Sequence, residues 1–171
     1  MSFLSSESKG INRQLQAALS TLEYCINECP TEEWQEKHRD APFSQVVFHT
    51  LFYCDFSLSG DEAEFKNQAF HRENMGTFDD YEELEYRAAV HLYEKEFVIK
   101  YLKYCREKIR LKLQNQTCIE LNNPVRIGNK EMTGLELFIY VARHIQHHAA
   151  QLGLRIQYLT GKEMKWFSQG E

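Results

Sequence analysis

Apolar residues return every three or four positions over long stretches of this chain, and this rhythm constrains the fold more than any other feature. Between residues 6 and 27 they form one continuous stripe, made by Ile11, Leu15, Leu19, Leu22 and Ile26. Such a stripe is typical of a helix that buries one face. Pro30 ends this first helix, because proline has no amide hydrogen to continue the ladder. With only 8 Gly and 3 Pro in 171 residues, the chain has too few turn residues for a sandwich of short strands.

Two further helices follow from the same rhythm. The second begins at Pro42 or Ser44 and continues to Leu58, and it is apolar on nearly every side, which is typical of a central helix. The third begins at a capping sequence, residues 77–80, and keeps close to a heptad rhythm as far as Leu113. A helix of that length is either a long arm of a bundle or broken partway.

The connections on either side of the third helix differ in pattern. Residues 59–76 lack clear periodicity and are expected to be a long connection. Within residues 114–132 the segments 118–121 and 125–127 alternate around Asn-Asn-Pro, which predicts a small hairpin or an extended loop. A fourth helix, from a capping box at 133 to about residue 159, follows this segment. The chain is therefore expected to be a single all-α domain over residues 1–171, a four-helix bundle with a small hairpin or loop insertion before the last helix.

Charge and cysteine content narrow the function classes. The chain has 20 basic and 25 acidic residues, a net charge of −5, which argues against a nucleic-acid module. No segment near the start looks like a secretory signal, and the most apolar stretches, 46–56 and 137–142, are too short or too interrupted to span a bilayer. Five cysteines without a Cys-x-x-Cys pair indicate free, mostly buried thiols in a reducing, cytoplasmic compartment.

Three histidines form the candidate metal site. His144 and His148 lie four residues apart on the fourth helix, which begins at a capping box at 133 and ends near 159, so they share one face about 6 Å apart along the axis. A third ligand must come from another element, and His49 is the candidate because a buried imidazole needs partners for its nitrogens. Two alternatives to a metal site stay open. The histidines of the last helix can lie on a solvated face, as we expect for His147, and His49 can form a hydrogen bond with a carbonyl.

Two residues beside these histidines are catalytic candidates. Tyr53 lies one turn beyond His49, so its hydroxyl could face the same cavity and polarise a substrate. Gln151 shares the face of His148 and could orient water or a ligand imidazole. For Tyr53 the alternative is ordinary core packing.

The other ionisable residues are assigned structural or surface positions. Asp55 lies off the face of the second helix that carries His49, and we expect it to pair with a charge elsewhere. Glu96 is either a partner of a ligand or, as the pattern favours, a solvated edge. His71 and His91 are expected at the surface.

Two segments of this sequence resemble the DinB/YfiT-like family of metal-dependent proteins. Residues 42–49 resemble the start of that family's second helix, and residues 144–155, His-Ile-Gln-His-His-Ala-Ala-Gln-Leu-Gly-Leu-Arg, are similar to its His-x-x-His-His-x-x-Gln segment. The resemblance extends over nearly the whole chain in length and order of elements. It implies a four-helix bundle, usually a homodimer, that binds one divalent metal through His49, His144 and His148.

The chemistry implied by the resemblance is less uniform than the fold. Members of the family look like thiol-dependent S-transferases or isomerases, or like metal-dependent hydrolases, and many have no known activity. Three protein ligands leave a coordination position open, where an ion lowers the pKa of water or of a thiol. Zinc suits three imidazoles best, while nickel, cobalt or manganese are also compatible.

These observations support three hypotheses of different classes. The first is a metal-dependent enzyme that activates water or a low-molecular-weight thiol for attack on a small-molecule substrate. The second is a non-catalytic metal-binding or stress-related bundle. The third is a helical interaction protein whose histidines are polar core residues.

Overall fold

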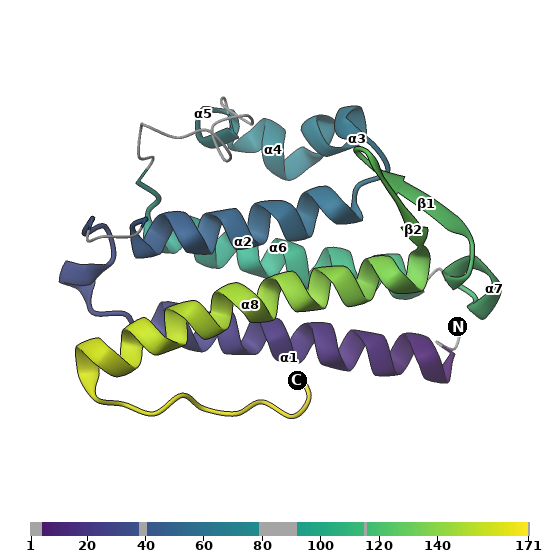
Figure 1. Cartoon of the computed structure of the whole chain (residues 1–171). Coiled ribbons are helices and arrows are strands. Elements are labelled where there is room, and N and C mark those ends of the chain that lie inside the picture. Colours follow the sequence, from purple (N-terminus) through teal and green to yellow (C-terminus); the bar gives the residue numbers. More distant parts are fainter. Residues whose placement is uncertain (1–4, 38–40, 79–91, 115, 171) are drawn as a thin grey trace.

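Four long helices form the body of the protein in the computed structural model, which describes residues 5–37, 41–78, 92–114 and 116–170 (Figure 1). They are α1 (Ser6–Glu28), α2 (Phe43–Leu58), α6 (Lys95–Gln114) and α8 (Gly134–Thr160). The predicted all-α four-helix bundle is confirmed, and the expected bounds of the first, second and fourth helices agree with the structure to within about two residues.

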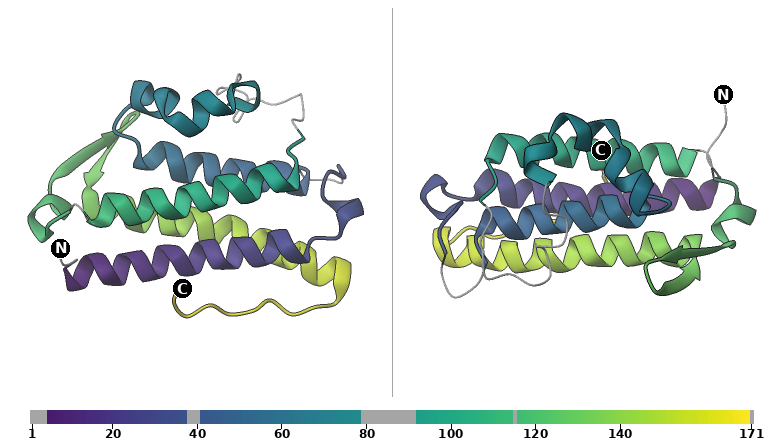
Figure 2. Two further views of the ribbon diagram at one scale, coloured as in Figure 1. Left: turned by 180° about the vertical axis from the view of Figure 1, so that it is seen from behind. Right: turned by 90° about the horizontal axis from the view of Figure 1, so that it is seen from above.

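Each of the helices α1 and α2 packs against both α6 and α8, so α1 and α2 occupy opposite corners of the bundle. Two views show that α1 and α8 run in one direction while α2 and α6 run in the other (Figures 1 and 2). The neighbours α2 and α8 are therefore antiparallel. Residues early in α2 consequently face residues late in α8.

The parallel course of α2 and α6 requires a connection that returns along the bundle. Three short helices make this return above α2, namely α3 (Glu62–Asn67), α4 (Ala69–Glu73) and α5 (Met75–Phe78). The long connection was predicted in the right place, but its short helices were not, because segments of four to six residues show no helical period.

The third long helix differs from the sequence prediction. Thr77 lies inside the short helix α5, and residues 92–94 are not helical, so α6 begins only at Lys95. A continuous helix from 77 to 113 is therefore wrong, and the alternative of a break is correct. Residues 79–91 lie outside the described part of the chain.

The predicted hairpin before the last helix is present, and the predicted segment 125–127 lies in its first strand, but the partner strand is not 118–121. Strand β1 (Pro124–Ile127) pairs antiparallel with β2 (Lys130–Thr133), and Gly128 in the turn has a φ of 57°. Residues 118–121, expected in a hairpin strand or an extended loop, form the short helix α7 (Cys118–Leu121) instead.

Capping explains where α7 and α8 begin. Thr117 and Glu120 form a reciprocal capping box at α7, which stabilises a helical turn in a segment whose alternation alone suggested a strand. The predicted capping box of Thr133 and Glu136 opens α8, and Gly161 ends it with a left-handed φ of 69°. The predicted start of the last helix at a capping box at 133 and its predicted end near residue 159 are therefore confirmed.

The core lies between the four long helices and extends beneath α5. Phe48 on α2 stacks on Tyr93 with ring centroids 3.8 Å apart, and the indole of Trp34, just after the 3₁₀ turn η1 (Thr31–Glu33), donates a 2.8 Å hydrogen bond to the Tyr93 carbonyl. These contacts fix the residues that precede α6.

The thiols of Cys25, Cys29, Cys54 and Cys105 are free and buried, as the sequence predicted. Burial raises the pKa of Cys25 to about 12 and that of Cys29 to about 11, so both are protonated and unreactive at neutral pH. Within the described residues, no helix is both long enough and apolar enough to cross a membrane.

Candidate metal centre

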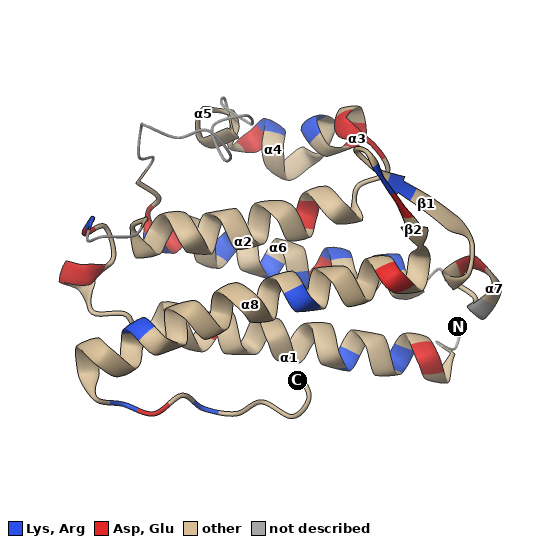
Figure 3. Cartoon of the chain, viewed as in Figure 1, with Lys and Arg blue, Asp and Glu red and all other residues tan. Residues whose placement is uncertain are grey.

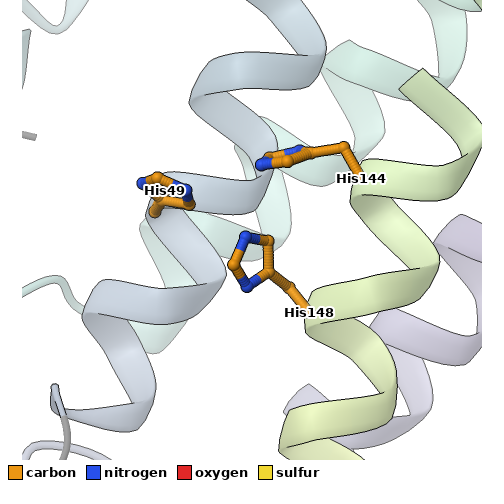
Figure 4. A group of neighbouring side chains, drawn as sticks. All are labelled: His49, His144 and His148. Atoms are coloured by element: carbon orange, nitrogen blue, oxygen red, sulfur yellow. The ribbon is translucent and has the colours of Figure 1, made fainter. Parts of the chain in front are cut away.

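The three predicted histidines come together between α2 and α8. His49 projects from α2, while His144 and His148 project from successive turns of α8 (Figure 4). Each of the three side chains is partly buried. The convergence predicted from the spacing of His144 and His148 and from the position of His49 in an apolar helix is confirmed.

The distances within the cluster suit a shared ion. One ligand nitrogen from each of His49, His144 and His148 lies within 4.8 Å of the other two. The ring centroids are 5.4 Å apart for His49 and His144, 4.8 Å for His49 and His148, and 4.7 Å for His144 and His148. Two nitrogens bound to one zinc ion at about 2.1 Å are at most about 4.2 Å apart. Small rotations of the side chains therefore suffice to bring all three nitrogens to bonding distance of one ion.

An unsatisfied nitrogen shows that the cluster fits a metal. Nδ1 of His144 is buried and has no hydrogen-bond partner in the described structure. Burying a polar atom without a partner costs about 1–3 kcal/mol, so such atoms are uncommon in folded proteins. A metal ion bound at this imidazole would compensate for part of the cost of burying it.

The electrostatics of the cluster keep the imidazoles in the form that binds metal. Burial and the neighbouring His148 and His49 lower the pKa of His144 to about 3. Burial also lowers the pKa of His148, although its hydrogen bond with Gln151 acts in the opposite direction. At neutral pH both imidazoles are therefore neutral, with a lone pair available for a ligand bond.

The two catalytic candidates lie beside the histidines. Oε1 of Gln151 is 2.8 Å from Nδ1 of His148, so the structure places Gln151 as a partner of this imidazole. The Tyr53 ring is partly buried, with its centroid 4.8 Å from that of His49 and 5.8 Å from that of His144. Both residues thus border the place where an ion would be held.

A cavity of about 580 Å³ opens next to the cluster, between α2 and the second half of α8. His49, His148 and Gln151 lie along one side of it. The rest of the lining is largely apolar and comprises Ala41, Gln45, Val46, Leu152, Leu154, Arg155 and Tyr158. A mostly apolar pocket of this size with a few polar groups is typical of a small-molecule site.

Comparison with known families agrees with this geometry. The profile of the DinB superfamily matches residues 14–152, a range that contains all three histidines, the whole of α2 and α8 as far as residue 152. The chain belongs to the DinB superfamily. No curated protein and no solved structure matches the chain. The resemblance seen in the two histidine segments is thereby confirmed at the level of the superfamily.

In this DinB domain, the described residues contribute no Cys, Asp or Glu to the three-histidine cluster. The nearest carboxylate along α2, Asp55, is fully buried and pairs with Lys108 and His71, as expected of a residue with a charged partner elsewhere. The cluster therefore has the ligand set of an open site, since structural zinc sites have four protein ligands.

Two predictions about other ionisable residues are confirmed and one is wrong. Glu96 and His147 are exposed, as expected. His71, expected at the surface, is fully buried, and its Nε2 lies 2.8 Å from Oδ2 of Asp55. The short helix α4 places it there, and sequence periodicity could not reveal that helix. His91 lies outside the described residues.

Arg155 lines this cavity, and the sequence assigned it no role. It follows His148 by seven residues and Gln151 by four, so it continues the same face of α8 into the cavity lining. That spacing is the signal that could have found it.

Proposed function

We propose that this DinB-superfamily chain is a metal-dependent enzyme. It would activate water or a small thiol for attack on an electrophilic small molecule, as a hydrolase or a thiol S-transferase does. The observation that carries the proposal is the position of the cluster, because His49 and His148 form part of the wall of a cavity large enough for an organic substrate.

The residues have distinct roles in this proposal. His49, His144 and His148 would hold one divalent ion, zinc being the best match to three imidazoles, with nickel, cobalt or manganese compatible. When bound, such an ion acts as a Lewis acid and lowers the pKa of the water or thiol that attacks. Gln151 orients the imidazole of His148, and the hydroxyl of Tyr53 polarises the substrate.

The cavity favours this function over a metal site that only joins two helices. Joining α2 to α8 requires ligands on both helices, but it requires no space beside them. The cavity next to His49 and His148 is instead lined by Val46, Leu152 and Leu154, which can accommodate the apolar part of a ligand. A homodimer and a cytoplasmic location, which resemblance and cysteine content suggested, belong to the same proposal, and sedimentation velocity tests the former.

Metal content tests the first step of the proposal. Protein purified without an affinity tag is analysed by inductively coupled plasma mass spectrometry as wild type, His144→Ala and His147→Ala. The matched control is His147, which is exposed on the same helix and is not a member of the cluster. We expect about one equivalent of divalent metal in wild type and His147→Ala and none in His144→Ala. Equal metal content in all three proteins would overturn the proposal.

Turnover tests the second step. Wild type, metal-stripped protein and metal-restored protein are compared for ester hydrolysis and for conjugation of small thiols to electrophilic substrates. Activity that disappears with the metal and returns with it supports an enzyme. Bound metal without any metal-dependent turnover would instead favour the non-catalytic metal-binding hypothesis.

A further inference from the structure

The cavity beside the histidines contains a cationic side chain whose hydrogen-bonding capacity is not used up. Nη1 of Arg155 donates a 2.9 Å hydrogen bond to the Ala41 carbonyl, and its guanidinium carbon lies 5.5 Å from the centre of the Phe43 ring. Nη2 of the same group is buried, and no described residue accepts a hydrogen bond from it. The guanidinium is therefore held in place by two contacts while one of its donors is unsatisfied.

This arrangement is unfavourable unless something else binds there. A buried donor without an acceptor costs about 1–3 kcal/mol, and more when the group is charged. No acidic side chain among the described residues forms an ion pair with Arg155, whereas Arg106 and Lys108 each have an acidic partner, Glu23 and Asp55 respectively. Within the described residues Nη2 of the guanidinium thus lacks an acceptor, and an anion is the acceptor that suits its charge best.

The surroundings define what kind of anion fits. Arg155 lines the same cavity as Val46, Leu152 and Leu154, so a ligand that reaches the guanidinium also contacts an apolar wall. Along α8, seven residues separate Arg155 from His148, which is about 10.5 Å at the usual helical rise. A carboxylate at one end of an apolar chain or ring matches both features, since a guanidinium binds the two oxygens of a carboxylate in one plane.

We propose that Arg155 binds the carboxylate of a small amphipathic ligand, whose other end extends toward His49 and His148. The inference that the ligand reacts at its other end rests on the proposed metal-dependent function. The contact between Arg155 and the carboxylate does not, because neither partner needs the metal. The carboxylate belongs either to the attacking thiol or to the electrophile.

Binding of octanoate to metal-free protein tests the contact directly. Isothermal titration calorimetry compares octanoate with its neutral analogue octanamide on wild type, Arg155→Gln and Arg126→Gln, the last being a matched loss of charge at an exposed arginine of β1 outside the cavity. We expect wild type and Arg126→Gln to bind octanoate at least about tenfold more tightly than octanamide, because hydrogen bonds between charged groups are strong. In Arg155→Gln we expect that preference to be lost.

A second pair of variants guards against an effect of Arg155→Gln on folding. Leu154 lines the cavity and is half exposed, so Leu154→Glu and Leu154→Gln change the charge near Arg155 without removing it. We expect Leu154→Glu to bind octanoate more weakly than Leu154→Gln does, and the two to bind octanamide alike. Octanoate binding that is the same in Arg155→Gln as in wild type, or the same in the two Leu154 variants, overturns the proposal.

The metal content of Arg155→Gln separates this inference from the proposed function. Wild-type metal content together with a lost octanoate preference supports both. An octanoate preference that depends on Arg155 in a protein that binds no metal supports the carboxylate site and refutes the metalloenzyme. On zinc-loaded protein, tighter binding of 8-mercaptooctanoate than of octanoate would place the carboxylate on the thiol, and equal binding would place it on the electrophile.

Discussion

The amide oxygen of Gln151 lies 2.8 Å from Nδ1 of His148, one turn earlier on the same helix. An amide oxygen only accepts hydrogen bonds, so Nδ1 of His148 carries the hydrogen in this pair. The lone pair is then on Nε2, which becomes the nitrogen of His148 that can bind an ion. Partners of this kind fix both the tautomer and the ring orientation of metal-binding histidines.

Replacing Gln151 should therefore weaken metal binding without removing a ligand. We expect Gln151→Leu to lower the affinity for zinc by about 10–100-fold, the usual cost of losing such a partner, and Gln151→Glu to keep it, because a carboxylate also accepts from Nδ1. Competition with a chromophoric chelator measures the affinity. Gln157→Leu, at an exposed position of α8, is the control. An unchanged affinity in Gln151→Leu would contradict the role of this hydrogen bond.

The hydroxyl of Tyr53 is expected to act on the substrate and not on the metal. Tyr53→Phe should retain one equivalent of metal and the wild-type melting temperature, while kcat falls by about 10²-fold, the effect of losing one polarising hydrogen bond. Tyr24→Phe is the control, since Tyr24 is on α1, which carries none of the three histidines, and its hydroxyl donates a hydrogen bond to the Glu163 carbonyl. If kcat is unchanged in Tyr53→Phe, the side chain only packs against His49.

The parts of the site that were predictable are those fixed by spacing along one helix. His144, His148 and Gln151 share a face of α8 by simple periodicity, so sequence alone brings them together. His49 is on another helix, and its partners follow only from the antiparallel packing of α2 on α8. It was found because an imidazole is out of place in so apolar a helix.

The parts that were not predictable depend on contacts distant in sequence or on very short elements. His71 is buried because α4 folds over α2 and brings it to Asp55, sixteen residues earlier. A helix of five residues has too few positions to show a period, and so His71 resembled a surface residue. The segment 118–121 is equally ambiguous, because four alternating residues fit a strand as well as one helical turn.

Removal of the metal should lower thermal stability, because an ion that binds only the folded state stabilises it. At a free metal concentration of about 100 times Kd, binding raises the free energy of unfolding by about 2.7 kcal/mol. For a domain of this size about 2–4 °C corresponds to 1 kcal/mol, so a chelator is expected to lower the Tm of metal-loaded protein by about 5–10 °C. Differential scanning fluorimetry measures the shift. His147→Ala should respond as wild type does and His144→Ala should not respond, whereas equal shifts in both would place the ion elsewhere.

A second ionic cluster, separate from the histidines, connects the short helices to the bundle. Asp55 accepts from the Tyr101 hydroxyl at 2.8 Å, pairs with His71 at 2.8 Å and forms an ion pair with Lys108. The side chains of Asp55 and His71 are fully buried, and that of Lys108 is 10% exposed. Helix α6, to which Lys108 belongs, is rich in Lys and Arg (Figure 3). Asp55 on α2 is the acidic partner of Lys108.

Loss of the Asp55 charge should therefore be strongly destabilising. We expect Asp55→Asn to lower the free energy of unfolding by about 3–5 kcal/mol, because the buried ammonium of Lys108 is left without its counter-charge. Glu62→Gln, which breaks an exposed pair with Lys66, should change it little, since exposed ion pairs contribute little. Urea denaturation measures both. A loss below about 1 kcal/mol in Asp55→Asn would show that Lys108 escapes to solvent.

The stabilisation from Asp55 should disappear in acid. Burial alone would raise the pKa of this carboxyl, but the hydrogen bond with His71 and the charge of Lys108 outweigh it and hold the pKa below its usual 3.8. Because the unfolded chain takes up the proton at higher pH than the folded one, the contribution is fully present above about pH 3.8 and is lost as the pH falls through the folded-state pKa. The difference in free energy of unfolding between wild type and Asp55→Asn should thus be large at pH 5 and shrink below pH 3.8. Urea titrations from pH 5 to pH 2.5 measure it, and a difference that stays constant over that range would mean that the Asp55 carboxylate does not provide this stabilisation.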